Sequence, residues 1–294
     1  MSVLKKKITR AMPDWLVKIR AYQKKSGRIP NIISPATFTE KVMHRMLFDR
    51  RPILTQIADK MGARVYVESR LGAQILPKLY YVTSNPASIP FDQLPDQFVV
   101  KPTVGNGGVE IVTEKASLDR GGLILTCQNW LRANSDEVRR EAPTHLEPSI
   151  LIEELITDPS GGMPSEYKLY VFDGTVRLIQ VDLGRGDSKR RRLYSPNWKR
   201  LNVRHVYSDV PGPLPRPPHL DDMIAAAERL GHGMEFVRAD FFDTAEGFYF
   251  GELNATPGSG LELFQPPEFD HYLGSMWQLP RSVLLTRLLQ ICGL

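Results

Sequence analysis

The stretch of sequence that decides the fold reads Phe236-Val237-Arg238-Ala239-Asp240-Phe241-Phe242, and the chain returns as Phe250-Gly251-Glu252-Leu253-Asn254-Ala255-Thr256-Pro257-Gly258. Both segments are apolar and rich in aromatic residues. The intervening Asp243-Thr244-Ala245-Glu246-Gly247 has the composition of a turn. We therefore predict a β-hairpin in which the two segments are antiparallel neighbours.

The polar residues of this hairpin are predicted to share one face. With the turn centred near residue 246, Asp240 lies opposite Glu252. Side chains alternate along a strand, so Asn254 joins Glu252 and Arg238 joins Asp240 on that face. Two carboxylates, an amide oxygen and a guanidinium then converge, as in a hard-cation site beside an anion. The alternative is an exposed hairpin whose polar face is only solvated.

Composition describes an ordinary globular chain. Its 294 residues are 42% hydrophobic and 24% charged, and this length allows two or three subdomains. Two cysteines, Cys127 and Cys292, are too few for a disulfide framework, which favours a reducing compartment. No apolar run reaches the roughly 18 residues of a membrane span. We therefore expect a cytoplasmic protein.

The positive charge is concentrated in residues 1–30. That segment holds nine Lys or Arg and one acid, whereas the rest of the chain holds 29 basic and 32 acidic residues. Trp15, Ile19 and Tyr22 recur within it at helical spacing. The pattern predicts either an amphipathic helix on an anionic membrane face or a solvated helix packed on the domain. A basic arm without a basic domain does not indicate a nucleic-acid-binding protein.

The order of the expected elements is that of an α+β protein. We predict helices at about 38–49, 55–71, 118–132, 219–231 and 275–290, and strands at 79–83, 97–102, 109–113, 149–154, 167–172 and 176–182. Thr37 and Glu40 are spaced as a capping box for the first helix. Asp173-Gly174 predicts a tight hairpin turn between the last two strands.

Two strand ends carry residues suited to a nucleotide. One strand ends at Lys101 and runs into Gly105-Asn106-Gly107-Gly108, where backbone amides and a lysine suit a polyphosphate. A plain hairpin turn is the alternative. The strand at 149–154 ends in Glu153 and Glu154, which could meet an adenine ring and ribose hydroxyls or simply enter a polar loop.

Two further segments add charged groups. Alternation places Glu166 and Lys168 on one face of their strand. The run Lys189-Arg190-Arg191-Arg192 is either a solvated run or a site for an anionic substrate. The P-loop, Rossmann and protein-kinase signatures are absent from the sequence.

Together these segments resemble the ATP-grasp superfamily, and within it the TupA-like ATP-grasp proteins of bacterial cell-surface polymer gene clusters. The resemblance spans nearly the whole chain after the basic arm. The motifs that carry it are Thr37–Lys41, Asp59–Val67, Phe98–Pro102, Ile152–Glu154, Tyr167-Lys168, Val237–Asp240, Phe250–Asn254 and Pro257–Gly260.

The resemblance implies an ATP-grasp fold. An N-terminal domain over residues 1–95 would precede two small α+β subdomains, 96–156 and 157–294, that clamp ATP between them. The resemblance implies that Lys60 and Lys101 bind phosphates, that Gly105, Asn106, Gly107 and Gly108 form a lid over them, and that Glu153, Glu154 and Leu155 bind adenine and ribose. It implies magnesium binding for Asp240, Glu252 and Asn254, and catalysis for Arg238 and Lys168. It also implies acceptor binding for Ser259 and Gly260.

The implied activity is that of a carboxylate–amine ligase that uses ATP and two Mg²⁺ ions and forms an amide through an acyl phosphate. A carboxylate and an amine in surface-polysaccharide or peptide-polymer biosynthesis would be its substrates, and Arg190–Arg192 are candidates for binding an anionic acceptor. The alternatives are a kinase with the same ATP site, a non-catalytic nucleotide-binding accessory protein, and a glycosyltransferase.

Overall fold

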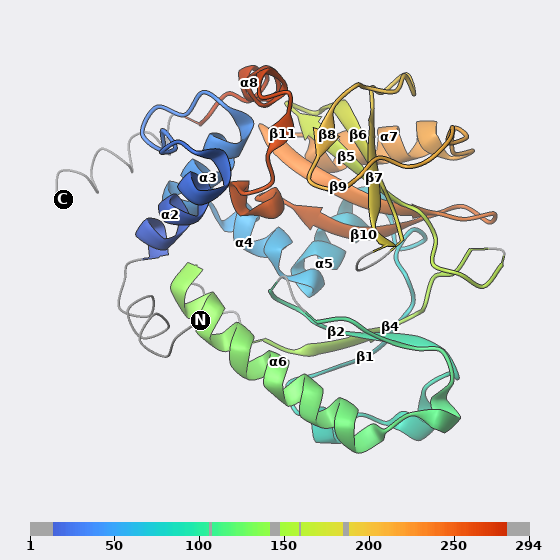
Figure 1. Ribbon diagram of the computed structural model, residues 1–294. Coiled ribbons are helices and arrows are strands. Elements are labelled where there is room, and N and C mark those ends of the chain that lie inside the picture. Colours follow the sequence, from blue (N-terminus) through green and yellow to red (C-terminus); the bar gives the residue numbers. More distant parts are fainter. Residues whose placement is uncertain (1–13, 106–107, 142–147, 159, 185–187, 281–294) are drawn as a thin grey trace.

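A computed structural model describes residues 14–105, 108–141, 148–158, 160–184 and 188–280 (Figure 1). The helices are α2 (Asp14–Ser26), α3 (Phe38–Phe48), α4 (Pro52–Ala58), α5 (Lys60–Leu71), α6 (Arg120–Glu141), α7 (Leu220–Gly231) and α8 (Glu268–Ser275). The strands are β1 (Leu79–Thr83), β2 (Phe98–Pro102), β3 (Glu110–Val112), β4 (Ile150–Glu153), β5 (Glu166–Phe172), β6 (Thr175–Leu183), β7 (Arg190–Tyr194), β8 (Arg204–His205), β9 (Phe236–Asp243), β10 (Phe248–Asn254) and β11 (Phe264–Gln265). The predicted α+β class is confirmed.

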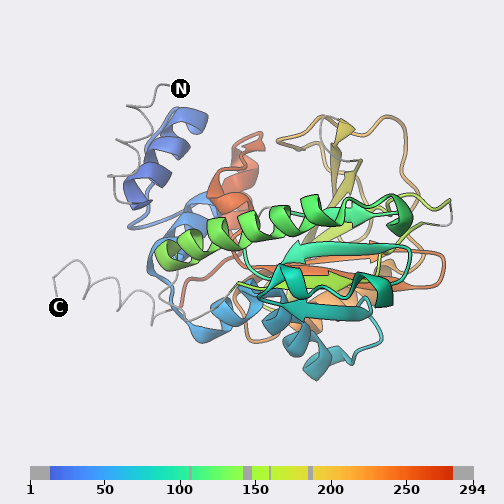
Figure 2. The same cartoon turned by 90° about the horizontal axis from the view of Figure 1, so that it is seen from below.

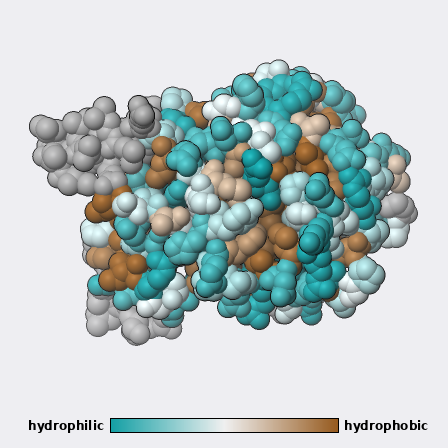
Figure 3. Space-filling view, turned by 90° about the horizontal axis from the view of Figure 1, so that it is seen from above, coloured by the Kyte–Doolittle hydropathy of each residue, from teal (hydrophilic) through white to brown (hydrophobic). Residues whose placement is uncertain are grey.

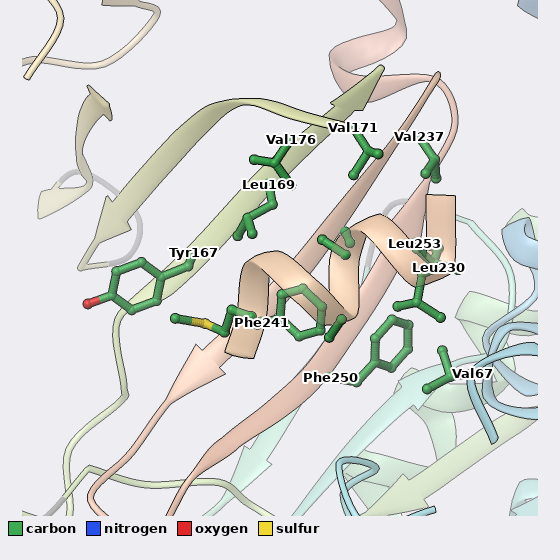
Figure 4. Packing of buried hydrophobic residues seen from close by; sticks show 14 of the residues in the cluster. Val67, Tyr167, Leu169, Val171, Val176, Leu230, Val237, Phe241, Phe250 and Leu253 are labelled. Atoms are coloured by element: carbon green, nitrogen blue, oxygen red, sulfur yellow. The ribbon is translucent and has the colours of Figure 1, made fainter. Parts of the chain in front are cut away.

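The larger sheet has the strand order β10-β9-β5-β6-β7, and α7 covers one of its faces. Figure 4 shows Leu169 and Val171 of β5, Val237 of β9 and Leu230 of α7 in one apolar cluster. The residues that α7 buries recur at a spacing of three or four and include Leu220, Met223, Ala227 and Leu230. This stripe fixes the helix against the sheet and leaves the opposite sheet face for the site.

The opposite face of the larger sheet is partly apolar, and there it packs against α3 and α8. Phe38 of α3 lies with its ring centroid 4.9 Å from that of Phe236, and Trp277 lies beside both rings. The predicted capping box is present, because Thr37 and Glu40 each accept a hydrogen bond from the backbone N–H of the other. The helix therefore begins at a defined point above the sheet.

The smaller sheet has the strand order β1-β4-β2-β3, and α6 lies across one of its faces (Figure 2). Phe98 of β2, Ile150 and Ile152 of β4, and Leu123 and Cys127 of α6 are buried together. Burial raises the pKa of the Cys127 thiol to about 11, which makes it an apolar packing group and not a nucleophile.

The single helix predicted at 55–71 is in fact two helices, α4 and α5. Asp59 separates them, because its backbone is extended and its side chain accepts a hydrogen bond from the Gly62 N–H at 2.9 Å. Gly62 packs against the end of α4, where a Cβ would lie 2.3 Å from the carbonyl oxygen of Gln56. The break places Lys60 at the first position of α5.

The helix predicted at 275–290 is wrong at its start. α8 ends at Ser275, and residues 277–280 have no regular secondary structure. Trp277 is fully buried against Phe38 and Phe236, so the chain turns inward where the helix was expected to begin. The remainder of that prediction, from residue 281 onward, lies outside the described residues.

The basic N-terminal segment contains a helix that packs on the domain. Tyr22 of α2 is 1% exposed and its hydroxyl lies 3.3 Å from that of Thr39, while Lys25 donates to the carbonyl of Leu261 at 3.2 Å. Trp15 is 48% exposed. On the face seen in Figure 3, hydrophobic residues lie in small groups among hydrophilic ones. In the described ranges, no helix is long and apolar enough to cross a membrane.

Candidate functional site

The predicted hairpin is formed by β9 and β10, with Glu252 opposite Asp240 and Asn254 opposite Arg238. The register shifts between Phe250 and Glu252, so Gly251 forms a β-bulge that the sequence did not predict. Without the bulge, Phe250 and Glu252 would point to the same face. With it, Phe250 packs in the core and Glu252 faces the opposite side. Gly251 suits this position, since a Cβ would lie 3.2 Å from the Asp240 carbonyl oxygen.

Asp240 is fully buried at the centre of the polar face. Lys168 lies directly across from it on β5, and its Nζ is 2.7 Å from Asp240 Oδ2. Arg238 donates from Nε to Oδ1 at 2.7 Å and from Nη2 to Oδ2 at 2.6 Å. The same Nη2 donates to Glu252 Oε1 at 2.9 Å, and Asn254 donates to that oxygen at 3.4 Å. The structure thus brings together the four polar residues predicted for the hairpin face and Lys168, for which the family resemblance implied a catalytic role.

The electrostatic environment differs between the two carboxylates. Burial raises the pKa of Asp240, although Arg238 and Lys168 oppose the rise. Burial would raise the pKa of Glu252 as well, but the charges of Arg238, Lys168 and Lys60 bring it to about 2. For Lys168, burial lowers the pKa, yet the charges of Asp240, Glu166 and Glu252 together outweigh this and raise it. Lys168 and Glu252 are therefore charged at neutral pH.

The donor set fits a hard divalent cation. Asp240, Glu252 and Asn254 supply two carboxylates and an amide, all oxygen ligands of the kind that Mg²⁺ prefers. Within the described ranges, no group of three or more His, Cys, Asp or Glu is arranged to hold a metal, and the third candidate ligand of this set is the amide of Asn254. Both oxygens of Asp240 accept hydrogen bonds from Arg238 or Lys168, and a bound metal would share that carboxylate with them.

The two predicted phosphate lysines line one cavity with Glu252 and Asn254, two of the three metal-ligand candidates, whereas the buried Asp240 is not among its lining residues. This cavity has a volume of about 320 Å³, and Lys60, Lys101, Gly105, Glu252 and Asn254 are among its lining residues. The Lys60 N–H donates to the carbonyl of Thr103 at 2.8 Å, which ties α5 to the end of β2. Burial lowers the pKa of Lys60, and the neighbouring charge of Lys101 lowers it further. An anion between the two lysines would relieve that repulsion.

The two adjacent acids at the end of β4 have different surroundings. Glu153 is buried and forms ion pairs with Lys101 and with Arg64, the latter at 3.2 Å. Glu154 accepts a hydrogen bond from the Lys78 backbone N–H at 3.0 Å. Leu155 follows them and is half-buried. Glu153 is thus positioned to hold Lys101, whereas Glu154 lies at the connection between the two sheets.

The glycine loop is partly outside the described residues, which exclude Asn106 and Gly107. Gly105 lines the cavity, and its carbonyl lies 3.5 Å from Lys60 Nζ. Gly108 has a φ of 99°, and a Cβ there would lie 2.5 Å from the ring of Trp130. Glycine therefore suits this end of the loop, since any other residue would be strained at this φ and would displace the Trp130 ring.

Sequence reasoning missed a buried polar network next to Lys168. Arg191 of β7 donates to both oxygens of Asp182, at 2.6 and 3.0 Å, and to Glu262 at 2.9 Å. Burial would raise the pKa of Asp182, but Arg191 lowers it to about 2. His205 lies 3.1 Å from Arg191 and from Gln180, and burial lowers its pKa to about 3. Arg191 and Leu193 are two positions apart on one strand and therefore share a face, and Leu193 is buried. This spacing could have indicated that Arg191 points inward.

The basic run at 189–192 is consequently not a solvated segment. Arg191 and Arg192 are 6% and 4% exposed, and Arg192 donates to Asp209 at 2.7 Å and to carbonyl groups of the loop that follows. Lys189 pairs with Asp182 at 3.0 Å. Carboxylates of the protein itself already neutralise these groups.

Glu166, which pairs with Lys168 at 2.7 Å, is a half-buried acid that the predicted site omitted.

Comparison with known proteins identifies the family. Residues 40–278 match the family described as TupA-like ATPgrasp. No curated protein matches the sequence. Similar solved structures include D-alanine–D-alanine ligase from Bacillus anthracis complexed with ATP, which is 18% identical over 78% of this chain and 63% of that chain with a TM-score of 0.44.

Two other solved structures are comparably similar. The L-amino acid ligase from Bacillus licheniformis is 19% identical over 70% of this chain and 45% of that chain, with a TM-score of 0.44. The ATP-grasp ligase PsnB complexed with minimal precursor is 14% identical over 70% of this chain and 55% of that chain, with a TM-score of 0.41. The chain therefore spans about half to two thirds of the length of these structures.

Proposed function

Because this chain belongs to the TupA-like ATP-grasp family, we propose that it is an ATP- and Mg²⁺-dependent carboxylate–amine ligase. The observation that carries the proposal is the cavity whose lining includes Lys60, Lys101, Glu252 and Asn254. Two lysines suit the phosphates of a nucleotide, and the oxygen donors suit the magnesium that accompanies them.

The proposed reaction has two steps. A carboxylate oxygen of the first substrate bonds to the γ-phosphorus of ATP, the bond from that phosphorus to the bridging oxygen breaks, and ADP leaves. The amine nitrogen of the second substrate then bonds to the acyl carbon, loses a proton, and releases phosphate. Bound magnesium would neutralise phosphate oxygens during the transfer. No side-chain nucleophile is required.

The residues of the chain would act by placing positive charge where negative charge develops. Lys60 and Lys101 are suited to hold the nucleotide phosphates, and Glu153 would fix the position of Lys101. Arg238 and Lys168 bring two cations beside Asp240, next to the proposed ligand set. We assign to them the stabilisation of the transferred phosphoryl group.

An isotope experiment tests the proposed chemistry. The protein would be incubated with ATP, Mg²⁺, amino acids, and acidic peptides or uronic acids whose carboxylates carry oxygen-18. A ligase places one labelled oxygen in the released phosphate and yields an amide detectable by mass spectrometry. Phosphate retained on the product would instead establish the kinase alternative. Nucleotide binding without turnover across the panel would favour an accessory protein.

The biological setting is part of the proposal. We place the reaction in the cytoplasm, where ATP is available, in the synthesis of a surface polysaccharide or peptide polymer. The basic charge of residues 1–30 supports peripheral contact with an anionic membrane face. Binding to vesicles of phosphatidylglycerol but not of phosphatidylcholine would support this contact, and equal binding to both would contradict it.

A further inference from the structure

A second cavity lies at the end of the larger sheet, where β5 begins and where β6 and β9 end. We name it the sheet-end pocket. It has a volume of about 480 Å³, and its lining residues include Met163, Glu166, Asp182, Lys189, Tyr207 and Phe242. None of these residues lines the cavity of the nucleotide lysines. The sheet-end pocket therefore offers a separate place for a ligand.

The strand register places the sheet-end pocket on the reacting face of the sheet. Glu166 lies opposite Asp182 on β6 and opposite Phe242 on β9. Two residues further along β5, Lys168 lies opposite Asp240. Residues two apart on a strand share a face, so the pocket and the Lys168–Asp240 pair lie on the same side of the sheet. A ligand in the pocket would lie next to the candidate catalytic residues.

Glu166 connects the sheet-end pocket to that pair. Its carboxylate is 2.7 Å from Lys168 Nζ, and the same ammonium is 2.7 Å from Asp240 Oδ2. The Asp240 side chain is fully buried and has a second cationic partner in Arg238, whereas the Glu166 side chain is 27% exposed. In the part of the chain that the structure describes, Lys168 is the only ion-pair partner of Glu166. Part of the negative charge of Glu166 is therefore available to a ligand.

The other charged groups of the sheet-end pocket, among the described residues, neutralise each other. Lys189 pairs with Asp182 at 3.0 Å, and both oxygens of Asp182 accept hydrogen bonds from Arg191. Lys189 Nζ also lies 4.9 Å from the ring centroid of Tyr207. The available charge in the pocket is thus that of Glu166, and it favours a cation.

The rest of the lining suits the organic part of such a cation. Phe242 and Tyr207 supply aromatic rings, and Met163 supplies a flexible apolar side chain. An ammonium group that carries an apolar substituent could contact a carboxylate and apolar side chains at the same time. The sheet-end pocket therefore has the chemistry of a site for an organic amine.

We propose that the sheet-end pocket binds the amine substrate as an ammonium ion and that Glu166 is the catalytic residue that takes its proton. This inference rests on the proposed ligase function. The ammonium transfers one proton to the Glu166 carboxylate, which leaves an uncharged amine. The amine nitrogen bonds to the acyl carbon, the bond from that carbon to the phosphate oxygen breaks, and the second proton leaves with the phosphate. Glu166 then releases its proton to solvent.

The test compares two nucleophiles in the presence of ATP, Mg²⁺ and a mixture of tetraglutamate and glucuronic acid as carboxylates. A mixture of amino acid amides supplies ammonium groups without carboxylates, so these compounds can act only as the amine. Hydroxylamine is uncharged at neutral pH and captures an acyl phosphate as a hydroxamate without the help of a base. Mass spectrometry measures both products.

Glu166→Gln should lower amide formation by about 100-fold or more, the loss typical of removing a general base, while hydroxamate formation changes by less than about threefold. As the pH rises, amide formation by Glu166→Gln should recover more steeply than that of the wild type, because the free amine no longer requires a base. Glu246→Gln changes an exposed acid in the turn of the β9–β10 hairpin and should keep both activities.

A second variant tests the sheet-end pocket while Glu166 and Lys168 stay in place. Met163→Lys adds a positive charge to the pocket wall. It should raise the amine concentration that gives half the maximal rate of amide formation by about fivefold or more, and leave hydroxamate formation unchanged. Leu125→Lys adds the same charge at an exposed position of α6 and is the matched control.

Binding of the non-hydrolysable nucleotide AMP-PNP by each variant serves as the control for folding. Equal losses of amide and hydroxamate in Glu166→Gln would mean that this residue only positions Lys168, and would overturn the inference. Unchanged amide formation in Glu166→Gln, or hydroxamate without amide in the wild type, would overturn it as well and leave the ligase proposal standing. Absence of both products in the wild type would instead reject the ligase proposal.

Discussion

Lys168 lies directly opposite Asp240 across β5 and β9, with its ammonium 2.7 Å from the buried carboxylate. This contact joins a catalytic candidate to a metal-ligand candidate. We expect Lys168→Gln to lower ADP formation by about 100-fold or more, the loss typical of removing one preorganised charge from a phosphoryl-transfer site. AMP-PNP affinity should change less, by under about 10-fold, because Lys60 and Lys101 remain.

The same variant also tests whether Lys168 is only structural. Arg238 still pairs with Asp240 in Lys168→Gln, so the loss in unfolding free energy should stay below the roughly 3–5 kcal/mol expected for an unpaired buried charge. Urea denaturation measures this. Lys199→Gln, an exposed change, is the matched control. Full activity in Lys168→Gln would remove this residue from the catalytic set.

Glu153 and Glu154 form a natural pair for comparison. Glu153→Gln removes the partner of Lys101 and Arg64, so Lys101 should lose its fixed position. We expect AMP-PNP affinity to fall by about 10-fold. Glu154→Gln retains an oxygen that can accept from the Lys78 N–H and should change the affinity by less than about threefold. The reverse order in a calorimetric titration would show that Glu154, and not Glu153, contacts the nucleotide.

His205 makes the stability of the fold sensitive to acid. Burial, with the neighbouring charge of Arg191, lowers its pKa to about 3, compared with about 6.5 in an unfolded chain. Between these values the unfolded chain binds the additional proton, so stability decreases as the pH falls below about 6.5. From pH 7.5 to 5 the loss should be about 2 kcal/mol.

A substitution isolates this contribution. His205→Asn keeps hydrogen-bonding groups near Gln180 but cannot titrate. The difference in unfolding free energy between pH 7.5 and pH 5, measured in urea, should be about 2 kcal/mol smaller in His205→Asn than in the wild type. An equal pH dependence in both proteins would mean that His205 is protonated without cost in the folded state.

The sequence predicted those elements whose determinants are local. The capping box of Thr37 and Glu40 and the Asp173-Gly174 turn were confirmed, because each depends on residues within a few positions of one another. The pairing of Asp240 with Glu252 was confirmed as well. The alternating pattern of β9 carried enough information to place its polar residues on one face.

Features that depend on distant contacts were not predicted. The bulge at Gly251 is favoured because Phe250 and Leu253 both pack in the core, which requires the folded sheet to be known. Arg191 and Arg192 of β7 were expected to be solvated or to bind an anion, but both are buried and form ion pairs with Asp182 and Asp209. The end of α8 before Trp277 was likewise not predicted, because the residues that pack around Trp277 lie on other elements.

The most direct test of the central claim is the effect of Mg²⁺ on AMP-PNP binding in the wild-type chain and in Glu252→Gln, measured by calorimetry. Glu246→Gln, which changes an exposed acid in the turn of the same hairpin, is the matched control. We predict that Mg²⁺ strengthens binding by about 10-fold or more in the wild type and in Glu246→Gln, and that Glu252→Gln loses this enhancement. Binding that is independent of Mg²⁺ in the wild type, or an enhancement that persists in Glu252→Gln, would contradict a magnesium–nucleotide site on this hairpin.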